Sequence, residues 1–215
     1  MLNKIKFFFV NLLYVITWII AWLLFKAYFR LTKIDTRNIP KGGVILACNH
    51  RSNLDPVMLS AGANRPVAYM AKAELFRIPG LAQLITIYAA FPVERGKGDT
   101  QALDTAGNML KTGYAVGMFP EGTRGTEDHI GRIKSGVAFV AASSGAPVVP
   151  VALVNTEKSL GKGSKGIKPA HIKVIYGKPF TYKDVNPDNT TSKENIRAFN
   201  ERLGVAIQEL YDIIK

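Results

Sequence analysis

A histidine and an aspartate lie five positions apart in the string NHRSNLDP, residues 49–56, directly after a short apolar run. His50 and Asp55 would not face each other on one regular helix, where neighbouring side chains are three or four residues apart. A turn over the polar residues between them would instead bring the carboxylate back to the imidazole. An aspartate that accepts from one ring nitrogen leaves the other free to take a proton from a substrate. The spacing therefore makes His50 a candidate general base and Asp55 its support.

The same residues also fit a structural role without chemistry. Asp55 precedes Pro56, and an aspartate at the N-cap with proline at the first helical position is a common helix start. His50 would then be a turn residue with its polar atoms satisfied. Spacing alone leaves both interpretations open.

Three further strings lie after, at the end of or within apolar runs. FPEGTR at 119–124 combines a glycine-containing loop with Arg124, a pattern that suits phosphate binding by a guanidinium and backbone N–H groups. It also suits a plain Pro-Glu-Gly turn with a solvated arginine. FPVER at 91–95 again ends in an arginine, whereas VVPVAL at 148–153 carries no reactive group and would line a wall or hold the core.

A sheet must bring these strings together, because functional groups gather at the C-terminal ends of parallel strands. Short apolar runs predict buried strands at 43–48, 66–71, 87–93, 115–119, 147–154 and 171–176, and helices at 56–63, 78–85, 100–112 and 135–144. A final helix carries apolar residues three and four apart from Ile196 to Ile214, with Thr191 and Glu194 as a capping box. Alternating strands and helices predict an α/β fold, with a largely parallel or mixed sheet flanked by helices.

Composition narrows the class of protein. The 215 residues include a single cysteine, Cys48, which excludes an internal disulfide framework and a cysteine-based zinc site. Histidines 50, 129 and 171 lack the spacing of metal ligands. The net charge of +12 indicates an anionic partner: nucleic acid, a membrane or a phosphorylated substrate. The chain has no recognition-helix signature and no aromatic-rich basic surface, so we expect no nucleic-acid partner.

The N-terminal segment indicates a membrane. Residues 7–25 are 19 uncharged residues, about 28 Å long as a helix, with basic residues on both sides and no acidic residue in 1–34. Basic flanks on both ends leave open whether the helix would span the bilayer or lie in one leaflet. We expect residues 1–34 to form a membrane anchor and residues 35–215 the catalytic domain.

The four strings in this order resemble the glycerolipid acyltransferase family of 1-acylglycerol-3-phosphate acyltransferases (PlsC-like). NHRSNLD resembles the family's HX4D motif, FPVER its second motif, FPEGTR its third and VVPVAL its fourth, and the resemblance covers roughly residues 37–181. The second string departs from the pattern, because Pro92-Val93-Glu94 stands where many members have an Ile-Asp-like stretch.

The resemblance implies a reaction and a role for each residue. His50 would be the general base on the sn-2 hydroxyl of lysophosphatidic acid, and Asp55 would orient it. An acyl thioester, either acyl-CoA or acyl carrier protein, would supply the acyl group without a bound cofactor or metal, giving phosphatidic acid. Arg124 would bind the acceptor phosphate together with Lys72 and Arg95. Glu121 and Gly122 would shape the acceptor pocket, and Thr123 would be a further substrate-binding residue. The catalytic domain would face the cytoplasm at the cell membrane.

Several alternatives stay open at this stage. Glycerol-3-phosphate and another lysophospholipid are alternative acceptors, and a non-catalytic protein that binds anionic membranes is an alternative of another class. Cys48 or Ser52 could be imagined as an acyl nucleophile, although an apolar strand favours an inert thiol at Cys48. Six lysines and no acidic residue between 158 and 178 could meet anionic lipid or donor phosphates, or form a solvated loop.

Overall fold

The computed structural model describes residues 27–87, 90–93, 100–125 and 129–215, and it contains a seven-stranded sheet in the order β1-β7-β6-β2-β5-β3-β4. The β6–β7 pair is antiparallel and every other neighbouring pair is parallel. The strands are β1 (Thr32–Ile34), β2 (Val44–Cys48), β3 (Val67–Lys72), β4 (Phe91–Val93), β5 (Ala115–Met118), β6 (Val148–Val154) and β7 (Lys173–Tyr176). The predicted α/β class with a mixed sheet is confirmed.

The central strands are β5, β2 and β6, and each is buried along its whole length. Their sequences are continuous apolar runs because both faces of a parallel sheet are covered by other elements. In register, Ala47 of β2 lies between Met118 of β5 and Pro150 of β6. The chain that leaves β2 and the chain that leaves β5 therefore emerge side by side at one edge of the sheet.

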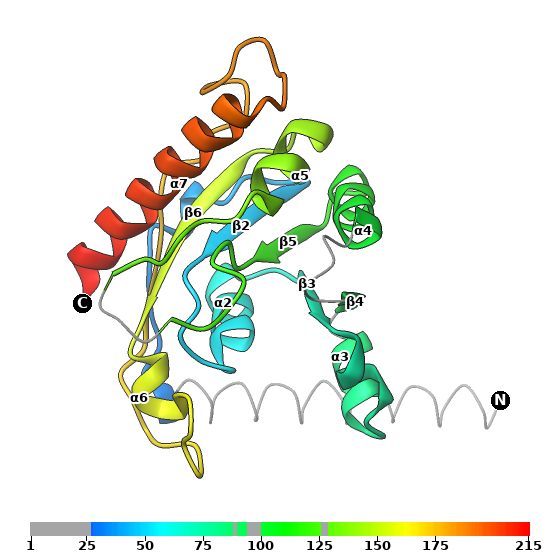
Figure 1. Ribbon diagram of the computed structural model, residues 1–215. Helices are drawn as coiled ribbons and strands as arrows, with labels where there is room; N and C mark the ends of the chain where they lie inside the picture. The colour runs from blue at the N-terminus through cyan, green and yellow to red at the C-terminus, as the bar shows by residue number, and fades with distance from the viewer. Residues whose placement is uncertain (1–26, 88–89, 94–99, 126–128) are drawn as a thin grey trace, which may run out of the picture.

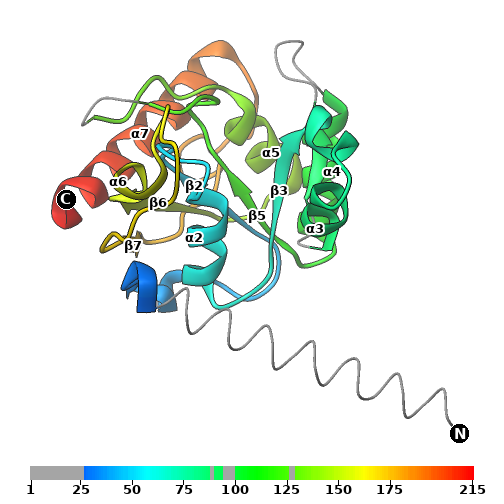
Figure 2. The same cartoon turned by 90° about the horizontal axis from the view of Figure 1, so that it is seen from below.

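Helices cover both faces of the sheet (Figures 1 and 2). On one face, α4, α5 and α7 pack against alternate strand residues such as Ile45, Ala47 and Val116. On the other face, α2 packs against Val44, Leu46 and their neighbours, and α6 contributes Leu160. The helices are α2 (Asp55–Ala63), α3 (Leu81–Ile87), α4 (Thr100–Lys111), α5 (Gly136–Ser144), α6 (Thr156–Leu160) and α7 (Lys193–Ile214), with 3-10 helices η1 (Thr36–Asn38) and η2 (Ala73–Arg77).

The long C-terminal helix α7 begins one residue later than its predicted capping box requires. Ser192 is the N-cap, with an extended backbone, and its hydroxyl accepts from the N–H of Asn195. The Thr191–Glu194 capping box is therefore wrong, because the capping hydroxyl belongs to the next residue. The predicted apolar face is correct: Phe199, Leu203 and Ile207 are fully buried against the sheet.

The apolar run of the predicted membrane anchor, residues 7–25, lies outside the described residues, whereas residues 27–34 of the predicted anchor are described. In the part of the chain that the structure describes, no helix has the length and apolar character needed to cross a membrane. Strand β1, near the end of the 1–34 segment, was not anticipated; it pairs with β7 and so joins the sheet. The division into 1–34 and 35–215 stays a prediction.

Candidate active site

The imidazole of His50 and the carboxylate of Asp55 meet in the turn between β2 and α2. His50 Nδ1 lies 2.8 Å from Asp55 Oδ2, and both side chains are buried. A proton on Nδ1, donated to the carboxylate, leaves Nε2 as the free basic nitrogen. The turn thus produces the arrangement that a general base needs, as the spacing predicted.

The Asp55 carboxylate is held by the backbone as well as by the imidazole. Its Oδ2 accepts from the N–H groups of Arg51, at 2.6 Å, and Ser52, at 2.8 Å. Helix α2 begins at Asp55 itself with Leu54 as its N-cap, so the N-cap interpretation of Asp55 is wrong. The carboxylate folds back over the turn that precedes it instead of capping the helix that follows.

Glu121 fixes the backbone of the turn from His50 to Asp55, called the catalytic turn below because it holds the candidate base. Its Oε2 accepts from the N–H of His50 at 2.8 Å, and its Oε1 accepts from the N–H of Gly131 at 2.8 Å. The N–H of Gly125 also donates to the carbonyl of His50 at 2.8 Å. The loop after β5 therefore holds both the N–H and the carbonyl of His50. Glu121 is thus a positioning residue.

Two more contacts set the position of the His50 ring. Asn49 is fully buried, and its side-chain amide exchanges two hydrogen bonds with the backbone of Leu153 on β6, at 2.9 and 2.7 Å. The His50 ring stacks on Phe119, with ring centroids 4.3 Å apart. The ring of Tyr69 lies nearly parallel to that of Phe119, with centroids 6.3 Å apart, and packs against Gly117, where any Cβ atom would collide with it.

Neither nucleophile alternative fits this geometry. Cys48 is fully buried in β2, and burial is the main cause that raises the pKa of its thiol well above the usual value, with Asp55 and Glu121 adding to the effect. A protonated, inaccessible thiol is a poor nucleophile. The Ser52 hydroxyl donates to the carbonyl of Leu160 and accepts from the N–H of Leu54, so it holds the turn together.

Comparisons with known proteins decide the family. The model of the acyltransferase family matches residues 30–154, which include the whole His50–Asp55 turn. The chain belongs to the acyltransferase family. A 1-acyl-sn-glycerol-3-phosphate acyltransferase of Bacillus subtilis is 33% identical over 178 residues, covering 82% of this chain and 85% of that protein. A probable 1-acyl-sn-glycerol-3-phosphate acyltransferase of Mycoplasma genitalium is 30% identical, covering 82% and 71%.

A solved structure supports the same assignment. The crystal structure of the 1-acyl-sn-glycerophosphate acyltransferase PlsC from Thermotoga maritima superposes with a TM-score of 0.67 at 26% identity, covering 85% of this chain and 71% of that chain. The predicted resemblance to PlsC-like acyltransferases is thus confirmed for fold and family.

The remaining predicted site residues of this acyltransferase are only partly brought together. Arg124 is half-buried and Thr123 is exposed, and both follow the turn at Gly122 that comes after β5. Lys72 is the last residue of β3, a strand that pairs with β5 through residues 67–69. The side chain of Lys72 is not among the parts of the chain that the structure describes. Arg95 lies outside the described residues altogether.

Sequence reasoning missed a cation beside this turn. Lys134 donates its backbone N–H to the carbonyl of Pro120, and its side chain lies over Gly122, where a Cβ atom would be 2.7 Å from the ammonium nitrogen. Gly122 also has a φ of +70°, a backbone conformation that favours glycine. No motif marks Lys134, because ten residues and a loop separate it from Arg124.

Another missed residue is Arg51, inside the catalytic turn. Its guanidinium is buried, donates to the carbonyl of His129 and lies over the ring of Tyr211 in α7, 5.1 Å from the centroid. Arg51 therefore links the catalytic turn to the C-terminal helix. Its contacts suit a structural role, and nothing in the string NHRSNLDP distinguishes it from a solvated arginine.

Proposed function

We propose that this acyltransferase moves a fatty acyl group from an acyl thioester to the sn-2 hydroxyl of lysophosphatidic acid, giving phosphatidic acid. The observation that carries the proposal is the 2.8 Å contact between His50 Nδ1 and Asp55 Oδ2, fixed by two backbone N–H groups. The acceptor is inferred from the relatives, which are named as acyltransferases of 1-acyl-sn-glycerol-3-phosphate.

The reaction needs one proton to move twice. His50 Nε2 takes the proton of the acceptor hydroxyl as its oxygen attacks the thioester carbonyl. The tetrahedral intermediate collapses, the C–S bond breaks, and the imidazolium returns the proton to the departing thiolate. Asp55 stabilises the imidazolium in between. The two substrates balance the reaction, so no bound cofactor enters the proposal.

The proposal is tested by offering the purified chain lysophosphatidic acid with an acyl thioester and following phosphatidic acid. Glycerol-3-phosphate and lysophosphatidylcholine, offered in competition, compare the acceptors. Faster acylation of either rival would overturn the assignment of lysophosphatidic acid. Association with anionic membranes without acylation of any acceptor would favour the non-catalytic alternative.

Arg124 is proposed to bind the acceptor phosphate. It follows the clamped turn after β5, and among the described residues it has no ion-pair partner. A guanidinium can hold a phosphate through two parallel hydrogen bonds. The bond between the N–H of Gly125 and the carbonyl of His50 keeps this part of the loop next to the base.

Arg124→Ala is expected to raise the KM for lysophosphatidic acid by roughly 10- to 100-fold, because a charged hydrogen bond contributes about 1.5–3 kcal/mol. Arg124→Lys keeps the charge but loses the paired geometry, and should fall between wild type and alanine. The measurement is the initial rate against acceptor concentration at saturating donor. An unchanged acceptor KM in Arg124→Ala would refute the phosphate assignment.

Membrane association is proposed for the face that carries α2 and α6. Lys158, Lys162, Lys165 and Lys168 are exposed in and after α6, and no acidic residue lies between 158 and 178. The loop that carries them is tied to Tyr28, whose hydroxyl donates to the carbonyl of Ile167. Tyr28 follows the uncharged run at 7–25 of the predicted anchor by three residues. We therefore place the anionic headgroups of a membrane at this loop.

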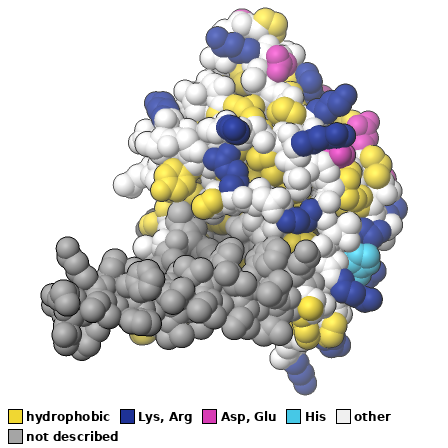
Figure 3. All heavy atoms as spheres, turned by 180° about the vertical axis from the view of Figure 1, so that it is seen from behind, with side chains coloured by type: hydrophobic (Ala, Val, Ile, Leu, Met, Phe, Trp, Pro, Cys, Tyr) yellow, Lys and Arg dark blue, Asp and Glu magenta, His cyan; other side chains and the backbone are white. Residues whose placement is uncertain are grey.

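The stretch between 158 and 178 is not one surface. Lys173 donates to the carbonyl of Ile214 at the end of α7, a structural role. Lys178 lies near the bridge between Phe180 and Val148, at the opposite end of β6 from α6. Figure 3 shows that Lys and Arg side chains also predominate over acidic ones on the rear face. Membrane contact is proposed only for the four lysines of the 158–168 loop, with the cytoplasm as the proposed location of the catalytic domain.

Lysines of this loop should couple activity to anionic lipid. In detergent micelles, adding phosphatidylglycerol is expected to lower the apparent KM for lysophosphatidic acid, and Lys162→Gln/Lys165→Gln should lose most of that gain. Each surface lysine contributes about 1 kcal/mol of attraction to an anionic surface. In the presence of phosphatidylglycerol, we therefore expect the apparent KM of the double variant to be about 30-fold higher than that of the wild type at low salt, and the difference to shrink at high salt. Lys111→Gln/Lys178→Gln removes the same charge at the other end of the sheet. Equal losses in both double variants would refute a specific surface.

A further inference from the structure

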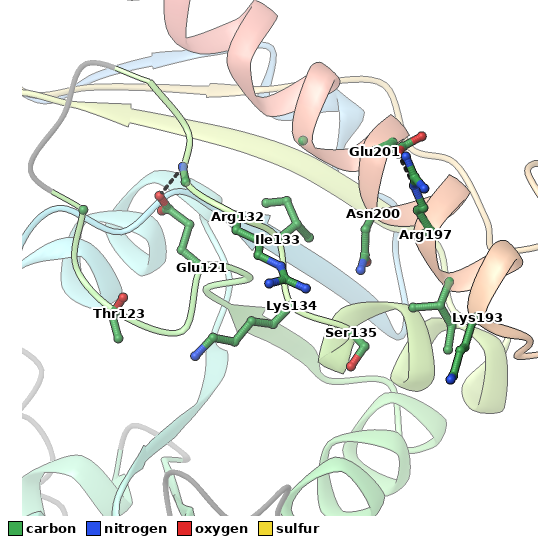
Figure 4. Close-up of a pocket in the computed structure, with 14 residues that line it drawn as sticks. Glu121, Thr123, Arg132, Ile133, Lys134, Ser135, Lys193, Arg197, Asn200 and Glu201 are labelled. Atoms are coloured by element: carbon green, nitrogen blue, oxygen red, sulfur yellow. Dashed lines mark hydrogen bonds and ion pairs between the residues drawn. The ribbon is translucent and has the colours of Figure 1, made fainter.

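A basic groove lies on the opposite face of the sheet from residues 158–168, which we call the lysine loop. It is a cavity of about 1130 Å³ between the segments 121–125 and 131–135 and the first half of α7. Figure 4 shows Arg132 extending from the loop toward the space in front of α7, where Lys193, Arg197 and Asn200 lie. We call this cavity the α7 groove; its charged lining residues are Glu121, Arg132, Lys134, Lys193, Arg197 and Glu201.

The α7 groove carries unneutralised positive charge. Among the described residues, Arg132, Lys134 and Lys193 have no ion-pair partner. The acidic residues offset only part of this charge, because the lining holds four basic and two acidic residues. Of the two acidic residues, Glu201 pairs with Arg197 at 2.7 Å, and Glu121 accepts from backbone N–H groups. The groove therefore fits an anionic ligand.

One polar atom in the lining also lacks a partner. Asn200 projects from α7 into the lining, and its Oδ1 is buried with no hydrogen bond to any described residue. A buried acceptor without a donor costs free energy, so a ligand or water that donates to it is expected there. Cations and an unused acceptor together suit a ligand with both phosphate and amide N–H groups.

The groove runs from the loop at 121–125, beside His50, to Lys193 and Arg197 near the start of α7. At one end, Glu121 and Gly125 both hydrogen-bond the backbone of His50. Along α7 the lining extends from Gly204, which packs on Ile133, to Lys193, about 16 Å at 1.5 Å per residue. An extended ligand with its reactive group at one end and its phosphate at the other fits this length.

The two faces of the sheet separate the two substrates by solubility. The lysine loop and Leu160 belong to the α2 face, whereas Ile133 and Ile196 of the groove pack on the α5 and α7 face. A lipid acceptor enters from a membrane, but acyl thioester donors are carried by water-soluble groups. A donor site on the face turned away from the lysine loop leaves both entrances open at once.

We propose that the α7 groove binds the phosphate end of the phosphopantetheine arm that carries the acyl thioester. This inference rests on the proposed function and adds the place where the donor is held. Acyl-CoA and acyl carrier protein share the arm and its phosphate, so the shared chemistry defines the ligand. Lys193 binds the phosphate at the far end of the groove, Arg132 adds its positive charge from the loop side, and Asn200 accepts from an amide N–H of the arm.

The test uses the full chain and the double variant Arg132→Ala/Lys193→Ala. Arg37→Ala/Lys111→Ala serves as the matched control, because it removes the same charge at exposed sites outside the groove. Direct binding of coenzyme A and of holo-acyl carrier protein is measured in separate arms. Initial rates are then measured against acyl-CoA, acyl carrier protein and lysophosphatidic acid in turn. Circular dichroism checks that each variant folds.

We expect at least tenfold weaker binding of one or both arm-bearing ligands in the groove variant, no change in the control, and a matching rise in donor KM with an unchanged acceptor KM. A change confined to one ligand identifies the donor. Unchanged binding in the groove variant, no binding of either ligand to the wild type, or a rise only in acceptor KM would overturn the proposal. If the wild type binds coenzyme A or holo-acyl carrier protein but acylates no acceptor, the proposed function fails. The binding measurements on the groove variant still test whether the α7 groove holds the donor.

Discussion

His50→Ala should lower kcat for acyl transfer by about a thousandfold while the chain stays folded. A positioned general base contributes roughly 10²- to 10⁴-fold to a reaction, and no second base lies within hydrogen-bonding distance of Asp55 among the described residues. The imidazole supplies the only titratable nitrogen that the turn holds against a carboxylate. The measurement is steady-state kcat with lysophosphatidic acid and an acyl thioester.

Folding and chemistry are separated by two companion variants. His50→Gln keeps much of the side-chain volume stacked on Phe119, so its melting temperature should stay close to that of the wild type even though its kcat falls with that of the alanine variant. His171→Ala removes an exposed histidine that bonds Thr32, and should leave kcat unchanged. Full activity in a folded His50→Ala variant would refute the proposed base.

The catalytic turn was predictable from the sequence because its contacts are local. His50 and Asp55 are five residues apart, and the buried strand before them and the helix after them follow from apolar patterning. The strings after β2 and β5 were expected to meet, since parallel strands end at one edge. The spacing left two roles for Asp55, as the N-cap of the next helix or as the partner of His50. The hydrogen bonds from the backbone N–H groups of Arg51 and Ser52 turn its carboxylate toward His50 and so favour the second role.

The supports of the site were not predictable, because they join distant segments. The bond from His50 to Glu121 spans 71 residues, and that from Asn49 to Leu153 spans 104. The resemblance implies that Glu121 shapes the acceptor pocket, which stays a prediction. The structure adds that both of its oxygens accept from backbone N–H groups, one of them that of His50. The α7 groove has the same origin: it joins a loop without a recognisable motif to a helix sixty residues later, and only the fold sets their charges opposite one another.

Asp55→Asn should retain the fold and lose activity, which isolates the charge of the carboxylate. All three hydrogen bonds that the carboxylate accepts go to Oδ2, and Oδ1 is buried without a partner. The asparagine oxygen can therefore take the place of Oδ2, with its NH₂ group in the place of Oδ1. The imidazole keeps its hydrogen bond but faces a neutral group when it takes the substrate proton.

The expected loss in kcat for Asp55→Asn is about 10²- to 10³-fold. Two opposite charges near contact attract by about 4 kcal/mol at an effective dielectric constant of about 20, which would correspond to about a thousandfold in rate. The retained hydrogen bond reduces that effect. Acceptor KM should be nearly unchanged, because Asp55 is assigned no contact with the phosphate. Asp104→Asn, which removes an exposed carboxylate from α4, is the matched control.

Asp55→Ala completes the comparison, because it removes the acceptor as well as the charge. Two backbone N–H groups, those of Arg51 and Ser52, would lose their partner inside the protein, at a cost of about 1–3 kcal/mol for each unsatisfied group. We therefore expect a lower melting temperature in the alanine variant but not in the asparagine variant, with kcat reduced in both. Equal kcat in Asp55→Asn and the wild type would mean that the carboxylate only shapes the turn, and that His50 acts without it.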